Sequence, residues 1–98
     1  MRALITGASS GLGREFARIW AKNGYDLVIT ARNLANLNAL KSEIEAKFGV
    51  RVFVFDCDLS QNTSVDKICE FVRENSLKID ILINNAVLEI TQNLLKVI

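Results

Sequence analysis

Apolar residues in this chain fall into short continuous runs that alternate with longer segments of helical spacing. The short runs predict β-strands at residues 3–5, 27–30, 50–55 and 79–83. A run such as 27–30, with almost no polar residue, suits a strand covered on both faces, as the strands of a parallel sheet are. The pattern therefore indicates a buried parallel sheet.

Three segments between these runs repeat apolar residues every three or four positions, which predicts amphipathic helices. Asn33 is suited to cap the second helix, and Gly49 is suited to end it. The stripes expected to face the sheet are Leu12, Phe16, Ile19 and Trp20 in the first helix, Leu34, Leu37, Leu40, Ile44 and Phe48 in the second, and Val65, Ile68, Cys69 and Val72 in the third.

Alternating strands and helices place this chain in the α/β class. Right-handed crossovers between successive strands predict four parallel strands in the order 3-2-1-4. A ligand cleft is expected at the carboxyl ends of the strands, between the first and the fourth. The 98 residues allow one small domain.

Glycines cluster where the first strand meets the first helix, in the segment Thr6-Gly7-Ala8-Ser9-Ser10-Gly11-Leu12-Gly13. A helix start has unpaired N–H groups and positive potential, and glycines let an anion approach the backbone. The spacing G-x-x-x-G-x-G differs from the fingerprint G-x-G-x-x-G, and no lysine follows Gly13 as a P-loop requires. We therefore predict a phosphate-binding turn; the alternative is a strand-to-helix turn that binds nothing.

Three motifs occur in the order found in a known family. The glycine segment resembles the T-G-x-x-x-G-x-G turn of short-chain dehydrogenases/reductases; Asp58-Leu59 resembles the acidic-aliphatic pair after their third strand, and Asn84-Asn85-Ala86 the start of their N-N-A-G motif. The resemblance implies a Rossmann-like three-layer αβα fold and NAD(P)-dependent oxidoreduction of a carbonyl or alcohol. It assigns residues 1–86 to an NAD(P)-binding domain and leaves residues 87–98 as a divergent tail, expected to be a short helix or an added strand. The cofactor-binding residues expected at these motifs are Gly7, Ser9, Ser10, Gly11, Leu12, Gly13, Asp58, Leu59, Asn85 and Ala86.

Arg32, just after the second strand, bears on the choice of cofactor. Dinucleotide folds that prefer NAD usually carry Asp or Glu in this region, where it accepts hydrogen bonds from the adenosine ribose. This chain has Ala31 and Arg32 there, and a guanidinium group forms forked contacts with a 2′-phosphate. NADP(H) is therefore predicted over NAD(H); the alternative is that Arg32 is a solvated loop residue.

The family's chemistry uses a serine and a Tyr-x-x-x-Lys pair that this sequence does not match. The single tyrosine is Tyr25, with Ile29 four positions later, and Val87 stands where the family's N-N-A-G motif has glycine. The sequence thus predicts the cofactor-binding portion of a truncated oxidoreductase, inactive by itself. The alternatives are a non-catalytic dinucleotide-binding remnant and a structural module. We also expect either that the tail folds back over the fourth strand or that the chain forms a homodimer through this exposed strand or the tail.

Composition narrows the remaining possibilities. The formal net charge is +1 and no basic patch suggests nucleic acid, nor does any apolar run approach the length of a membrane span. The two cysteines, Cys57 and Cys69, lack metal-binding spacing, and histidine is absent, so no metal site is expected. Free thiols and the lack of a signal-peptide pattern favour the cytoplasm.

Overall fold

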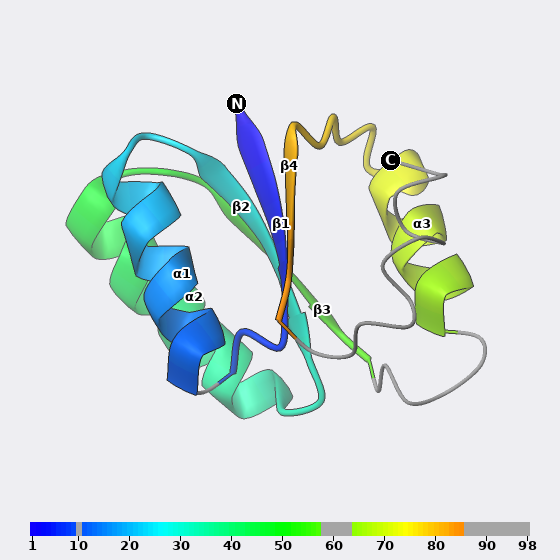
Figure 1. Ribbon diagram of the computed structural model, residues 1–98, viewed down its shortest axis with the longest axis horizontal. Coiled ribbons are helices and arrows are strands. Elements are labelled where there is room, and N and C mark those ends of the chain that lie inside the picture. Colours follow the sequence, from blue (N-terminus) through cyan, green and yellow to red (C-terminus); the bar gives the residue numbers. More distant parts are fainter. Residues whose placement is uncertain (10, 58–63, 86–98) are drawn as a thin grey trace.

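A computed structural model describes residues 1–9, 11–57 and 64–85 of the chain (Figure 1). Strands and helices alternate along it. The elements in chain order are β1 (Arg2–Thr6), α1 (Gly11–Lys22), β2 (Asp26–Ala31), α2 (Leu34–Phe48), β3 (Val52–Asp56), α3 (Ser64–Glu74) and β4 (Ile81–Asn84).

The four strands form one parallel sheet in the order β3-β2-β1-β4. Helices α1 and α2 cover one face of the sheet and α3 covers the other, which gives three layers (Figure 1). The predicted α/β, Rossmann-like architecture and its strand order are therefore confirmed. All strands point the same way, so their carboxyl ends meet at one edge, the lower one in Figure 1, where α1 and α2 begin.

Strands β3 and β4 begin two residues later than the apolar runs predicted, at Val52 and Ile81. At the start of β4, the Asp80 N–H donates to the Arg2 carbonyl and an Asp80 carboxylate oxygen accepts the Arg2 N–H, each at 2.9 Å. The backbone N–H of Arg2 therefore bonds to the side chain of Asp80. The paired ladder begins one step later, with Ala3 beside Ile81.

Apolar side chains of each strand alternate between two cores, one on each face of the sheet. In β1, Ala3 and Ile5 join the cluster under α1 and α2, whereas Leu4 joins the cluster under α3. Cys69 is buried in the second cluster, as predicted for a core thiol. Burial on both faces explains the nearly continuous apolar run in β2.

The predicted inward stripe of α1 was wrong in two of its four residues. Leu12 and Ile19 are 61% and 53% exposed, and the buried positions of α1 are Gly13, Ala17 and Ala21. These three residues are spaced by four and carry no side chain larger than a methyl group. A helix with such a face can approach the sheet closely, so the larger apolar residues beside it are displaced outward.

In α2, Leu37, Leu40 and Ile44 are buried as predicted, whereas Leu34 in the first turn is 43% exposed. The predicted ends are confirmed: the Asn33 side chain accepts the Asn36 N–H at 3.0 Å, and Gly49 has the left-handed φ of 71°.

Strand β4 lies at the end of the sheet, with β1 as its one neighbour among the described strands. Dimerisation through this strand stays a prediction. The tail at 87–98 lies outside the described residues. None of the described helices combines the length and apolar character that crossing a bilayer requires.

An ion pair joins α1 to α2. Two Arg18 nitrogens donate to the two Glu43 carboxylate oxygens, at 2.7 and 3.0 Å, and Arg18 also pairs with Glu15. The hydrogen bonds that Arg18 donates to Glu43 hold the pKa of Glu43 below its ordinary value and raise the pKa of Arg18.

The Glu43 pair is expected to add a small, acid-sensitive stability. A lowered carboxyl pKa in the folded state stabilises the fold at neutral pH, and this contribution is lost as pH falls below about 4.3, the ordinary glutamate value. Because the pair is partly exposed, the effect should be below about 1 kcal/mol. Chemical denaturation of wild type and Glu43→Gln from pH 7 to pH 3 measures it. The variant should lose less stability on acidification; parallel curves would contradict the assignment.

Candidate functional site

The turn between β1 and α1 lies at the carboxyl edge of the sheet. Gly7 and Gly11 have φ angles of 66° and 57°, which residues with a side chain rarely adopt. The Ala8 N–H donates to the Thr30 carbonyl at 3.2 Å, which ties the turn to the end of β2. The turn thus leads the chain to the amino end of α1, beside the ends of β1 and β2.

Gly13 has no room for a side chain. A Cβ atom built on it would lie 2.0 Å from the Gly7 carbonyl oxygen, 2.8 Å from the Gly7 carbonyl carbon and 2.9 Å from Nδ2 of Asn85. Gly11, by contrast, faces open space, with nothing within 4 Å of such an atom. The third glycine therefore lets the helix approach the turn, while the second borders open space.

Residues at the end of β4 fix the start of this turn from the opposite side. The buried Thr6 hydroxyl donates to Oδ1 of Asn84 at 2.6 Å and accepts the Asn85 N–H at 3.0 Å. The Asn85 side chain donates to the Gly7 carbonyl at 3.3 Å. Asn85, predicted to bind a cofactor, thus holds the glycine turn in place. Thr6 was part of the motif but had not been assigned this role.

A second backbone carbonyl of the glycine turn, that of Ser9, accepts a hydrogen bond from a side chain. The donor is Arg14, at the start of α1. Its guanidinium group donates to the Ser9 carbonyl at 2.9 Å. Sequence reasoning did not single out Arg14. Its one signal was a cation directly after the last glycine, at a helix end where the dipole disfavours positive charge.

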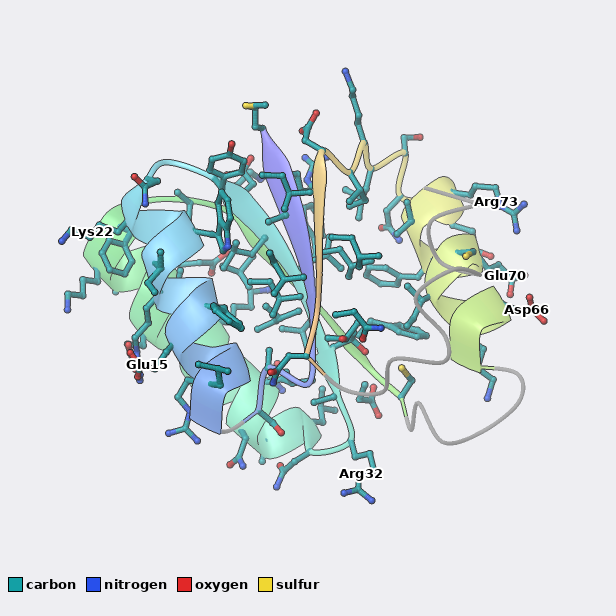
Figure 2. The ribbon with its side chains drawn as sticks, viewed as in Figure 1. Glu15, Lys22, Arg32, Asp66, Glu70 and Arg73 are labelled. Atoms are coloured by element: carbon teal, nitrogen blue, oxygen red, sulfur yellow. The ribbon has the colours of Figure 1, made fainter. Side chains whose placement is uncertain are left out.

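Arg32 extends from the end of β2 at the same edge, and it is exposed (Figure 2). Asn33, the cap of α2, follows directly, so Arg32 lies beside the positive end of a second helix. Among the described residues, the ion pairs involve Arg18 and not Arg32. The guanidinium charge of Arg32 thus lies at the same edge of the sheet as the glycine turn.

Four predicted site residues lie outside the described part of the chain: Ser10, Asp58, Leu59 and Ala86. The others, at the glycine turn, after β2 and after β4, lie at one edge of the sheet as the sequence predicted; their roles toward a cofactor stay predictions. The described residues contain no group of three acidic, histidine or cysteine side chains that could hold a metal ion.

Tyr25 lies at the opposite edge of the sheet. It directly precedes β2, and its ring packs edge-on against Trp20, with ring centroids 4.9 Å apart. Since the glycine turn lies at the carboxyl edge, Tyr25 is on the far side of the strands from it.

Comparison with known proteins matches the chain to one family over nearly its whole length. The model for short chain dehydrogenase matches residues 1–97. The very-long-chain 3-oxoacyl-CoA reductase of Candida glabrata is 37% identical over 83 residues, which cover 85% of this chain and 24% of that protein. The fatty acyl-CoA reductase of Acinetobacter baylyi is 37% identical over 84 residues, 86% of this chain and 28% of that protein.

Solved structures give the same result. A short-chain dehydrogenase from Sphingobium yanoikuyae in complex with NADPH is 40% identical, with a TM-score of 0.79 over 87% of this chain and 33% of that one. The L-sorbose reductase of Gluconobacter frateurii, complexed with NADPH and L-sorbose, is 40% identical, with a TM-score of 0.83 over 88% and 33%. The chain thus spans about a quarter of these curated relatives and about a third of these structures.

Proposed function

The chain belongs to the short-chain dehydrogenase family, and from this premise we propose that it is the NADP(H)-binding portion of an oxidoreductase acting on a carbonyl or alcohol. The observation that carries the proposal is the glycine turn, in which Gly13 packs against the Gly7 carbonyl with no room for a Cβ atom. This contact brings the amino end of α1, with its unpaired N–H groups, close against the turn.

The residues at the carboxyl edge fit a dinucleotide. The free N–H groups and dipole at the start of α1 favour a phosphate group beside the turn. Open space at Gly11 allows the phosphates to approach the backbone. Leu12, exposed on the first turn of α1, is available to cover the ligand. When bound, the nicotinamide supplies or accepts the hydride.

Preference for NADP(H) over NAD(H) is assigned to Arg32. Its guanidinium group is exposed beside the amino end of α2, and among the described residues it forms no ion pair. A 2′-phosphate suits such a group, because arginine forms two parallel hydrogen bonds to phosphate oxygens. Relatives solved in complex with NADPH at 40% identity support this choice.

Residues 1–98 are assigned to binding and orienting the cofactor rather than to proton transfer. A proton donor must reach the carbonyl at hydrogen-bonding distance, and Tyr25 lies at the opposite edge of the sheet. It also lacks a lysine four positions later, where Ile29 stands. Tyr25 is therefore assigned no part in proton transfer.

Calorimetric titration of the purified protein with NADPH and with NADH tests the proposal. We expect binding of one cofactor per chain, tighter for NADPH. Tighter binding of NADH would overturn the selectivity while leaving the dinucleotide site intact. No heat and no competition from either cofactor would contradict the proposed function and would favour the structural module.

A further inference from the structure

Two carbonyl groups of the glycine turn are held by side chains from outside the turn. Nδ2 of Asn85 donates to the Gly7 carbonyl from the end of β4, and the Arg14 guanidinium donates to the Ser9 carbonyl from α1. The donors reach the turn from different elements, and Asn85 is 78 residues from Gly7. The turn is thus fixed at two backbone oxygens.

Carbonyl oxygens matter in an anion site because they carry partial negative charge. A phosphate group is attracted by backbone N–H groups and repelled by carbonyl oxygens directed at it. A cation that holds a carbonyl both orients that peptide group and compensates its charge. Arg14, from α1, is the cation that holds the Ser9 carbonyl of the turn.

Arg14 and Arg18, one helical turn apart on α1, have different tasks. Both line a cavity of about 150 Å³ between α1 and α2, together with Asn36 and Glu43. Arg18 donates to both carboxylate oxygens of Glu43. The hydrogen-bond partner of Arg14 among the described residues is the Ser9 carbonyl. Arg18 therefore joins two helices, whereas Arg14 joins α1 to the turn.

We propose that Arg14 is a positioning residue of the cofactor site: it holds the Ser9 carbonyl so that the glycine turn receives the phosphates shared by NADPH and NADH. The inference rests on the proposed function. It assigns Arg14 a role distinct from that of Arg32, since Arg14 acts on the part common to both cofactors and Arg32 on the 2′-phosphate alone.

Three variants of the purified protein test this role: Arg14→Met, Arg14→Lys and, as the matched control, Arg18→Met. Methionine keeps an unbranched side chain of similar length without a donor, while lysine restores a cationic donor. Each variant is titrated with NADPH, with NADH and with inorganic pyrophosphate. Amide exchange at Ala8, whose N–H bonds to Thr30, reports the order of the turn without any ligand.

We expect Arg14→Met to lower the affinity for NADPH and for NADH alike by about tenfold, as the loss of a hydrogen bond to a charged group does. The ratio of the two affinities should therefore be unchanged. The affinity for pyrophosphate should fall in parallel, and Arg14→Lys should recover part of the lost affinity. Exchange at Ala8 should accelerate in Arg14→Met but not in Arg18→Met, which should bind like wild type.

Unchanged affinity in Arg14→Met would overturn the inference, and so would a loss confined to NADPH, which would indicate direct contact with the 2′-phosphate. An equal loss of affinity in Arg18→Met would also overturn the inference, because it would attribute the effect to the general stability of α1. If wild type bound neither cofactor, the proposed function would fail. The exchange rate at Ala8 would then decide separately whether Arg14 orders the turn.

Discussion

Gly13→Ala is expected to lower the free energy of unfolding by more than about 3 kcal/mol, beyond the usual range for overpacking a core. The added methyl would lie 2.0 Å from the Gly7 carbonyl oxygen. This oxygen belongs to backbone held by Asn85 and by the adjoining Ala8–Thr30 bond, so it cannot move without breaking them. Urea denaturation followed by circular dichroism measures the loss.

Gly24→Ala is the control for Gly13→Ala. Gly24 has a φ angle of 87°, but nothing lies within 4 Å of an added Cβ atom. Its cost is thus backbone strain alone, about 1 to 2 kcal/mol. Comparable losses in the two variants would contradict the close approach of α1 to the turn. If Gly13→Ala lowered the free energy of unfolding only slightly, that result by itself would contradict the close approach.

Arg32→Ala is expected to lower the affinity for NADPH by about 10- to 100-fold. This range follows from the roughly 1.5 to 3 kcal/mol typical of hydrogen bonds to a charged group. Affinity for NADH, which has no 2′-phosphate, should stay nearly unchanged. The affinity of wild type for NADPH should also fall steeply with added salt, since Arg32 is exposed and its charge is screened. Calorimetry at two salt concentrations measures both effects.

Arg73→Ala controls for the loss of one positive charge. Arg73 lies in the last turn of α3 and points away from the sheet, far from the carboxyl edge (Figure 2). Its removal should change neither affinity by more than about twofold, because exposed charges more than a Debye length apart are largely screened. If Arg32→Ala weakened both cofactors equally, Arg32 would not be a 2′-phosphate ligand.

The architecture could be predicted from the sequence because its signals are local. Four short apolar runs and three periodic segments determine which elements form, and the handedness of crossovers limits how they connect. The exposed positions of α1 could not be predicted in this way. Leu12 and Ile19 follow helical spacing. The small residues Gly13, Ala17 and Ala21, however, form the face that packs closely on the sheet.

The site was predictable as far as glycine spacing and strand order allowed. These two features placed Gly7, Arg32 and Asn85 at one edge of the sheet. The contacts that hold the turn could not be predicted, because Thr6 and Asn84 are 78 residues apart and meet only after β4 pairs with β1. Arg14 and Ser9 are only 5 residues apart in the sequence, but the hydrogen bond between them depends on the geometry of the turn rather than on any periodic pattern.

We propose that the carboxyl edge of this sheet binds a dinucleotide through its glycine turn. Two-dimensional NMR of isotopically labelled protein during titration with NADPH tests this binding residue by residue. We expect the largest shifts at the amides of Gly7, Gly11 and Gly13, a further shift at Arg32, and none at Tyr25 on the opposite edge. Shifts confined to the opposite edge, or none at saturating NADPH, would show that the glycine turn is not a dinucleotide site.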